Sequence, residues 1–347
     1  MDSEVRIAPD ELQELATRIF AAAGAPDDVA AEVAEHLVQS NLAGHDSHGV
    51  IRVRWYVEQV RAGWIRPESR PRVERETTTA ALVSGEWGFG HPAARLAMDL
   101  AVHRVLEHGL GAAGLVRATH IGRLGTYTER AADRGCVALM WLGGLGTHRA
   151  SVPYGGARPL YGTNPISAAF PAGSAGTVLL DYATTQVSGG KVMVARDRGV
   201  EVPPGCIVDA SGQPSTLPQD FFEGGALLPF GGHKGYAQAF FAQLLGQCLT
   251  GGEATGTEGF GGDAFRQSGS FFIAIDPGLL RPAEGSVQAA ASFVEKARAV
   301  PPAPGFERVM VPGDPEMNAR IERREAIVLP AATMESILLT ARELGLA

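Results

Sequence analysis

The pattern of hydrophobic and polar positions predicts that the chain begins with helices. From Pro9 to Gly24, apolar side chains recur at spacings of three and four residues, as they do on one face of a helix. Val29, Val33 and Leu37 repeat this spacing, and Gly44 marks the end of the second segment. We therefore expect two amphipathic helices at the start of the chain.

A third helix is predicted from Ser47 to Ala62, because valines recur along one side and Gly63 follows as a stop signal. His48, Arg52 and Tyr56 are spaced by four residues, so on a helix they share one face. An arginine fork binds a carboxylate with two hydrogen bonds, and the neighbouring His and Tyr can bind an adjacent oxygen. The alternative interpretation is an ordinary solvated helix face.

The middle of the chain changes to short apolar runs bounded by glycine, which are typical of strands. Helices with glycine stops alternate with these runs, at 92–108 and 235–249, and two more are expected at 287–297 and 334–344. The predicted strands are 80–83, 114–118, 137–142, 177–180 and 270–275.

We therefore predict an α/β protein of mixed α+β type in three parts. Residues 1–72 form an N-terminal helical domain, and residues 73–280 form an α/β domain. Residues 281–347 are expected to return and pack on the N-terminal helices.

A dinucleotide fingerprint, GxGxxG, is present at residues 109–114 but in the wrong context. The fingerprint requires a strand before it and a helix after it, so that the pyrophosphate meets the helix N-terminus. Here a predicted helix precedes the glycines and a predicted strand follows them. We interpret the segment as a helix-to-strand turn, and a Rossmann domain is not expected.

Composition narrows the class of protein. The 347 residues carry a net charge of −8, and no run of Lys or Arg suits nucleic acid or anionic lipid. Three cysteines lie far apart, which fits a reducing compartment. The acidic N-terminus does not resemble a signal peptide, and no apolar stretch is long enough to cross a membrane. We expect a cytoplasmic protein without nucleic-acid or membrane partners.

His120 is the candidate acid/base. It follows a predicted strand and lies beside the glycine-bearing turn Ile121–Gly125, a place where ligands commonly bind. An imidazole can give a proton to a developing alkoxide and take it back near neutral pH. A capping or core histidine is the alternative from these residues alone.

Three further segments carry groups that suit a ligand. Thr163 lies in the rigid loop 162–165, and Asp181 follows a predicted strand at the start of 181–185. In 228–235, glycines and Lys234 lead into a helix, where a cofactor pyrophosphate can rest. Plain turns remain the alternative for the first two segments.

A metal site is not predicted. His45 and His48 are spaced as half of such a site, but no HExxH motif or Cys/His cluster supplies the other ligands.

Taken together, these segments resemble the malate/L-lactate dehydrogenase family of the second type, which includes ureidoglycolate and sulfolactate dehydrogenases, diketogulonate reductase and piperideine-2-carboxylate reductase. The resemblance covers about Pro9 to Leu329. The matching segments are Ser47–Gly49 with Arg52 and Tyr56, 120–127, 162–165, 181–191, 228–236 and 312–316.

The resemblance implies a fold and a site. Such enzymes bind NAD or NADP without a Rossmann domain, on a central mixed or antiparallel sheet with a helical domain from both chain ends, usually as homodimers. His120 would be the catalytic proton donor and acceptor. Small carboxylate substrates would be bound by His48, Arg52, Tyr56 and Thr163, and the cofactor by Asp181, Ala183, Thr184, His233, Lys234 and Gly235.

The sequence departs from the family pattern in two places. Tyr182 and Thr185 replace a usual Met and Ser, which is expected to affect the fit of the cofactor. Cys206 stands where a tryptophan is common, which is expected to affect packing on the substrate side.

The leading hypothesis is interconversion of a small 2-oxo acid and its 2-hydroxy acid, with His120 moving the proton. Reduction of a cyclic imine carboxylate is a close alternative, since the same arginine and proton donor serve a C=N bond. A binding protein without catalysis would be expected to lack His120 or Lys234, and a metal-dependent hydrolase would use His45 and His48.

Overall fold

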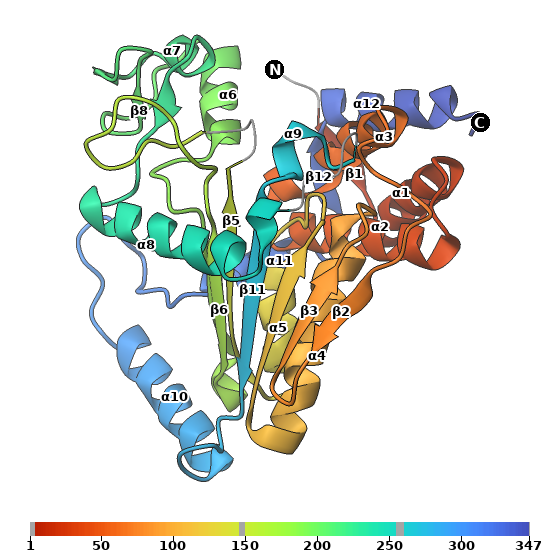
Figure 1. Cartoon of the computed structure of the whole chain (residues 1–347). Helices are drawn as coiled ribbons and strands as arrows, with labels where there is room; N and C mark the ends of the chain where they lie inside the picture. The colour runs from red at the N-terminus through yellow and green to blue at the C-terminus, as the bar shows by residue number, and fades with distance from the viewer. Residues whose placement is uncertain (1–3, 146–149, 255–259, 347) are drawn as a thin grey trace.

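The computed structural model describes residues 4–145, 150–254 and 260–346. It is built around a tall central sheet. A helical unit and a smaller unit with a second sheet lie at the upper end of this sheet, on opposite sides of the view in Figure 1. The cofactor-binding and substrate-binding segments predicted above all lie near this end.

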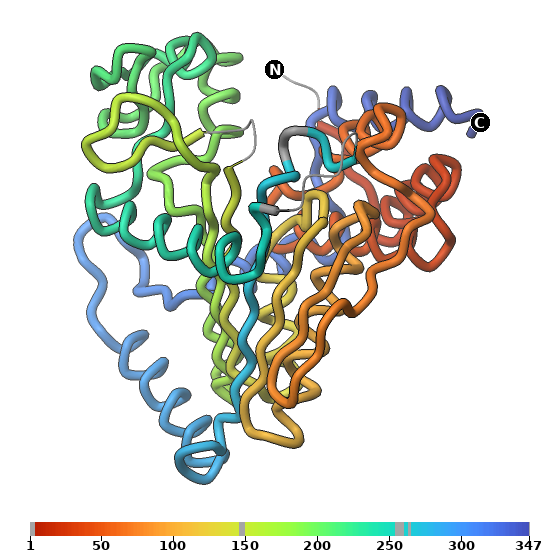
Figure 2. Tube along the Cα trace, in the orientation of Figure 1, coloured from red at the N-terminus to blue at the C-terminus, as the bar shows by residue number. Residues whose placement is uncertain are grey.

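Both chain ends contribute to the helical unit. Helices α1 (Pro9–Ala22) and α2 (Asp27–Leu42) form as predicted. Strand β1 (Glu4–Ile7) pairs antiparallel with β12 (Ile327–Pro330), and α12 (Ala331–Glu343) closes the chain beside it. In Figure 2 the first described segments of the trace, in red, and the last ones, in dark blue, lie together in this helical unit. Their shared core contains Leu12, Phe20, Leu37, Val53, Ile327 and Ile337.

The predicted third helix is only partly correct. Two 3-10 turns, Asp46–His48 and Val50–Arg52, replace its first half, and α3 begins at Val53 and ends at Arg61. Gly49 between the turns is extended because the Asn41 side chain accepts a hydrogen bond from the Val50 amide at 2.9 Å. A Cβ at Gly49 would lie 2.2 Å from the side-chain oxygen Oδ1 of Asn41. His48 and Tyr56 therefore do not share one helix face.

Within the described residues the central sheet has seven strands in the order β2-β3-β4-β11-β5-β6-β7. Only β3 and β4 are parallel, so the sheet is mixed, as the family resemblance implies. Strands β2 and β6 are missing from the sequence-based prediction, and so is the start of β4. The bounds are β2 (Arg72–Glu76), β3 (Ala80–Ser84), β4 (Leu110–Val116), β5 (Val137–Gly144), β6 (Ile166–Pro171), β7 (Thr177–Tyr182) and β11 (Ser268–Ile275).

Helices cover both faces of the sheet. On one face, α4 (Gly90–His108) and α5 (Gly125–Asp133) bury Met98 against Met140 and Phe272. On the other, α8 (His233–Gln243) continues into a π-helical turn, Leu244–Cys248, and crosses the sheet in Figure 1. This double cover explains the near-continuous apolar runs of the central strands.

The GxGxxG segment is a helix-to-strand turn, as predicted. Gly109 ends α4 with a left-handed φ of 74°, and β4 begins at the next residue. A Cβ at Gly111 would lie 2.0 Å from the Ala101 carbonyl oxygen, so glycine there permits close helix–strand packing.

A small unit lies beyond the end of the sheet and was not separated in our domain assignment. It contains the three-stranded sheet β10-β8-β9 and two short helices. Its strands have two residues each, too few to give a periodic signal. The bounds are α6 (Gly189–Asp197), β8 (Ile207–Val208), β9 (Pro214–Ser215), α7 (Pro218–Phe222) and β10 (Ala226–Leu227).

The prediction that all of residues 281–347 pack on the N-terminal helices is wrong for its first part. Helix α10 (Ala283–Arg298) instead packs beside the central sheet, where Val294 contacts Ala172. From α11 (Asp314–Arg323) onward the chain contacts the helical unit. None of the helices in the described ranges is long and apolar enough to cross a membrane.

Candidate active site

A cavity of about 460 Å³ lies where the helical unit, the sheet and the small unit meet. Its walls come from the 3-10 turns before α3, the loop after β4, the end of β5, the loop before β6 and the start of α6. They also include α7 and the short helix α9 (Gly262–Phe265). The predicted residues His48, Arg52, His120 and Thr163 line it. Segments far apart in the sequence therefore form one site.

His120 is packed among aromatic rings at the wall of this cavity. The Tyr56 hydroxyl lies 2.6 Å from its Nδ1, His48 stacks on it at 5.7 Å between centroids, and Trp55 meets it edge-on at 5.5 Å. Because Nδ1 is occupied by the Tyr56 hydroxyl, Nε2 is the ring nitrogen left for a ligand. The ring is thus held in one orientation by its neighbours.

Both histidines at the cavity are neutral at physiological pH. Burial lowers the pKa of His120 well below 6.5, and the charge of Arg52 lowers it further. The pKa of His48 falls to about 3, again through burial first and Arg52 second. A neutral imidazole can accept a proton at one nitrogen and donate one at the other.

Arg52 brings an isolated positive charge to the cavity. Among the described residues that line it, Arg52 is the only charged side chain, and no carboxylate in the described ranges forms an ion pair with it. Its Nε donates to the Ser47 carbonyl at 2.7 Å, and its guanidinium lies 5.2 Å from the Trp55 ring centroid. These contacts orient the fork and leave its terminal nitrogens for an anion.

Tyr56 does not line the cavity, in contrast to the arrangement expected from a single helix face. It is 1 % exposed and lies behind His120, and its hydroxyl also reaches His91 Nε2 at 3.3 Å. The predicted contact of Tyr56 with a substrate therefore lacks support.

The three predicted cofactor segments are joined by hydrogen bonds. The amide and hydroxyl of Thr184 donate to the Thr163 carbonyl at 3.0 and 2.8 Å, and the Phe230 amide donates to the Thr184 carbonyl at 3.1 Å. The sequence predicted the segments separately but not their contact. The buried Thr184 hydroxyl thus holds the segments together.

Asp181 is directed away from the cavity. Its carboxylate accepts a hydrogen bond from the Gly125 amide at 2.8 Å and lies 3.2 Å from Arg123 Nε. Arg123 also pairs with Glu129, which in turn binds Arg320 of α11. This buried network fixes the loop that carries His120, so any contact of the Asp181 side chain with a cofactor remains a prediction.

The 228–235 segment leads into α8, which begins at His233, two residues earlier than predicted. His233 and Lys234 are exposed at this helix start, whereas Gly235 is buried. A Cβ at Gly235 would lie 2.1 Å from the Phe230 carbonyl oxygen, so glycine is required where the loop turns back.

The two departures from the family pattern lie outside the cavity wall. The Tyr182 hydroxyl donates to Gln238 of α8 at 2.9 Å, which ties the end of β7 to that helix. Cys206 is buried with Val192 and Ile207 in the core of the small unit, and it does not line the cavity.

Several residues at the site were missed. Trp55, Phe221 and Phe265 supply aromatic walls, and Ser188 with Gly189 and Gly190 supplies the start of α6. Ser188 followed by two glycines is a readable N-cap signal, since the Ser188 hydroxyl accepts from the Lys191 amide. No local pattern distinguishes Phe221 or Phe265 from core residues.

The two histidines considered for a metal have separate partners. His45 Nε2 lies 3.1 Å from Glu316 Oε1, whereas His48 Nδ1 lies 3.0 Å from the Ser47 hydroxyl and its ring stacks on His120.

The chain is similar to known proteins over nearly its whole length. Hydroxycarboxylate dehydrogenase B of Escherichia coli O157:H7 is 35% identical over 351 residues, covering 100% of this chain and 96% of that protein. The pyrroline-2-carboxylate/piperideine-2-carboxylate reductase of Pseudomonas putida is 35% identical over 301 residues, covering 85% and 86%. The structure of sulfolactate dehydrogenase from Methanocaldococcus jannaschii superposes with a TM-score of 0.88 at 28% identity, covering 99% and 98%.

The sequence model of the malate/L-lactate dehydrogenase family matches residues 7–338, nearly the whole chain. The chain therefore belongs to the malate/L-lactate dehydrogenase family and is an NAD(P)-dependent oxidoreductase of 2-hydroxy acids and their 2-oxo forms.

Proposed function

We propose that this enzyme binds the carboxylate of a small 2-oxo or 2-hydroxy acid at Arg52 and transfers the proton of its reacting oxygen at His120. The observation that carries this proposal is that Arg52, which has no carboxylate partner among the described residues, lies in the same cavity as the neutral His120, while the described lining holds no acidic side chain. In such a wall a substrate carboxylate has a single charged partner, which fixes its orientation.

The proton step uses the two nitrogens of His120. In the oxidation direction Nε2 accepts the hydroxyl proton of the substrate, and in the reduction direction Nε2 returns a proton to the oxygen. The Tyr56 hydroxyl at Nδ1 keeps the ring in place, so we assign Tyr56 a positioning role in place of the substrate contact first predicted. His48, stacked on His120, is left to contact the substrate oxygen or carboxylate.

The residues at the cavity fit a nicotinamide cofactor. Gly162 and Gly190 line the cavity, and a Cβ at either would meet no atom closer than 3.7 Å. At both positions the backbone therefore faces open space with no side chain in between. A flat ring can therefore lie against both segments. When bound, the nicotinamide supplies or accepts the hydride at its C4.

The remaining contacts with the cofactor are assigned to the joined segments. Thr163 lines the cavity, and the backbone at Ala183 and Thr184 lies next to it through the Thr163 hydrogen bonds. Lys234 is a cation available for a cofactor phosphate, because it is exposed at the start of α8, the positive end of the helix dipole. We keep His233, Gly235 and Asp181 as proposed cofactor-binding residues in these segments.

The test is nicotinamide oxidation, followed by near-ultraviolet absorbance, with NADH and NADPH across a panel of 2-oxo acids and cyclic imine carboxylates. Turnover of 2-oxo acids, lost on His120→Ala while cofactor fluorescence titration is unchanged, supports the assignment. If no acid of the panel is turned over by a cofactor-binding enzyme, the proposed substrate class is wrong.

Reduction of a cyclic imine carboxylate is the second candidate, because the Pseudomonas putida relative carries that activity in its name. Arg52 would bind the same carboxylate, and His120 would donate to nitrogen in place of oxygen. Faster turnover of the cyclic imines than of the 2-oxo acids in the same panel would favour this candidate.

We also propose a homodimer that works in the cytoplasm. An exposed apolar stripe runs along α8 and the π-helical turn, through Phe240, Phe241, Leu244 and Leu249, and such a stripe suits a subunit contact. The three cysteines are free, as suits a reducing compartment. Light scattering after gel filtration tests the dimer, and cell fractionation tests the location.

A further inference from the structure

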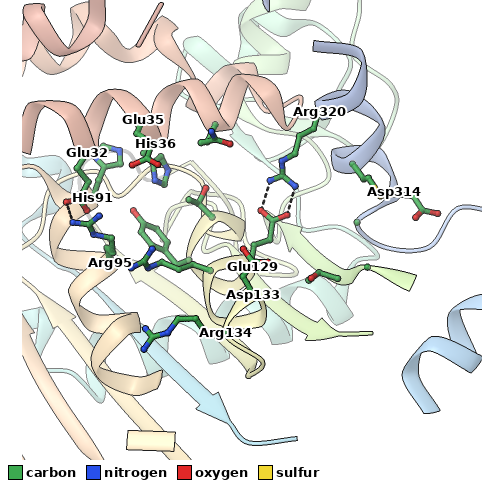
Figure 3. Close-up of a pocket in the computed structure, with 18 of the residues that line it drawn as sticks. Glu32, Glu35, His36, His91, Arg95, Glu129, Asp133, Arg134, Asp314 and Arg320 are labelled. Carbon is green, nitrogen blue, oxygen red and sulfur yellow. Dashed lines mark hydrogen bonds and ion pairs between the residues drawn. The ribbon is translucent and has the colours of Figure 1, made fainter. Parts of the chain in front are cut away.

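A second cavity, of about 560 Å³, lies on the other side of Tyr56 from the active site. Helices α2, α4, α5 and α11 form its walls, and charged side chains dominate them. In Figure 3, Glu32, His36, His91 and Arg95 lie on one side of this cavity, and Glu129 with Arg320 on the other. The function proposed above makes no use of it.

Three side chains connect the two cavities. Tyr56 lies 2.6 Å from His120 Nδ1 and 3.3 Å from His91 Nε2, so one hydroxyl bridges two imidazoles. His120 lines the active-site cavity and His91 lines the second one. Tyr56 and His91 are each 1 % exposed, so no bulk water competes for the bridge.

Unpaired polar atoms lie at the His91 end of these three connected side chains. His91 Nδ1, Glu32 Oε1 and Thr126 Oγ1 are buried, have no hydrogen-bond partner among the described residues, and belong to residues that line the second cavity. A polar space of this size with several unpaired groups is expected to hold water. The water would bond His91 Nδ1 and complete a path out of the protein.

We propose that His120, Tyr56 and His91 form a proton relay between the active site and the water of the second cavity, with His91 as its outlet. The relay rests on the proposed role of His120 as the group that exchanges a proton with the substrate.

The transfer balances without a net charge on any of the three side chains. In the resting arrangement His120 carries its proton on Nδ1, Tyr56 donates to His91 Nε2, and His91 carries its proton on Nδ1. When Nε2 of His120 takes the substrate hydroxyl proton, its Nδ1 proton passes to the Tyr56 oxygen. The Tyr56 proton passes to His91 Nε2, and the Nδ1 proton of His91 leaves to water. Reduction runs the same steps in reverse.

The active-site cavity offers no other store for this proton. Its described lining holds no acidic side chain, and the charge of Arg52 opposes a second positive charge on His120 or His48. Glu32 beyond His91 has a pKa raised to about 7 by burial, so it can exchange a proton with cavity water near neutral pH. An extra proton is therefore disfavoured in the active-site cavity, near Arg52, and is accepted in the second cavity, near Glu32.

The first variant is His91→Gln, which keeps a hydrogen-bonding group beside Tyr56 but cannot pass a proton from one ring nitrogen to another. Its matched control is His36→Gln. His36 packs against His91 with ring centroids 4.6 Å apart and lines the same cavity, but its Nε2 only accepts a hydrogen bond from the Arg123 amide, as glutamine can. For Tyr56→Phe the control is Tyr127→Phe, whose buried hydroxyl donates to the Ile121 carbonyl.

We expect His91→Gln and Tyr56→Phe to lower kcat by about tenfold or more, with a larger solvent isotope effect on kcat and little change in KM. The controls should stay within about twofold of the wild type. In His91→Ala, added imidazole should restore kcat in a saturable way, because the removed ring leaves space open to the second cavity.

The outcomes separate the relay from the proposed function. A wild-type enzyme that turns over 2-oxo acids, together with a fully active His91→Gln variant, overturns the relay alone. The same holds if His91→Gln is slow but its solvent isotope effect is unchanged and imidazole does not rescue His91→Ala, since His91 then only positions Tyr56. Absence of turnover in the wild type refutes the proposed function instead.

Discussion

His91 should make the enzyme less stable as the pH falls, by an amount that the structure defines. The ring is 1 % exposed, and burial lowers its pKa in the folded state to about 3. In the unfolded chain a histidine has a pKa of about 6.5. Because the folded value is the lower one, the unfolded state binds the proton first. The contribution of His91 is complete above pH 6.5 and is lost as the pH falls below it.

The size of the loss follows from the two pKa values. A pH of 5 lies about 1.5 units below the pKa of His91 in the unfolded state. Protonation of the ring there stabilises the unfolded state by ~2 kcal/mol, while the folded ring is still neutral. Replacing His91 by glutamine removes this proton-binding site. The difference in free energy of unfolding between wild type and His91→Gln should therefore shift by ~2 kcal/mol in favour of the variant between pH 8 and pH 5.

The assay is reversible urea unfolding of wild type and variant at both pH values, with equal m-values as the condition for comparison. His103→Gln, at an exposed position of α4, is the control for the substitution of a histidine by glutamine. A difference between wild type and His91→Gln that stays constant from pH 8 to pH 5 would refute the reasoning that burial keeps this ring neutral.

Three further variants test the site and its support. Arg52→Lys should raise KM for carboxylate substrates about tenfold in initial-rate assays, since one ammonium cannot form two parallel hydrogen bonds; an unchanged KM contradicts the carboxylate contact. His120→Ala should lower kcat by about 10²–10⁴, and near-normal turnover would rule His120 out as the acid/base. Gly122→Ala puts a Cβ 2.2 Å from His36 Nε2 at a φ of +72°, so its Tm should fall further than that of Gly135→Ala, where a φ of +81° meets no neighbour within 4 Å; equal losses would show that strain alone matters.

The sequence predicted the long helices well because each buries one clear face. In α1 and α2 the apolar spacing survives into a single core, and Gly24 and Gly44 follow both helices at left-handed φ values. The prediction failed at residues 47–52 for a local reason of another kind. Asn41 lies outside the segment and accepts a hydrogen bond from the Val50 amide. The periodicity within residues 47–52 gives no sign of this contact.

The site was predicted in pieces but not in its arrangement. His120 and Arg52 were found because each has a local signal, a strand end in one case and a suggestive spacing in the other. Their meeting depends on how α3 packs against the loop after β4, which is a tertiary contact. For the same reason the spacing of Tyr56 suggested a substrate contact, whereas packing turned its hydroxyl toward His120 and His91.

The isolated charge of Arg52 leads to a last prediction, on how substrate binding changes His120. Burial is the largest cause of the low pKa of His120, and the charge of Arg52 is the next. A bound substrate carboxylate cancels much of that charge at short range, so it should raise the pKa of His120 in the complex. The histidine would then become a stronger base only when a substrate is present.

Steady-state pH profiles can detect this change, because kcat/KM reports groups of the free enzyme and kcat reports groups of the complex. Oxidation of the hydroxy acid requires neutral His120, so both profiles fall on the acid side. We expect the acid limb of kcat at a higher pH than the acid limb of kcat/KM. Coincident limbs would mean that the carboxylate does not neutralise Arg52. In Arg52→Gln the acid limb of kcat/KM should itself lie at a higher pH than in the wild type, because the free enzyme then lacks the charge that lowers the pKa of His120; this ties the effect to the cavity's one described cation.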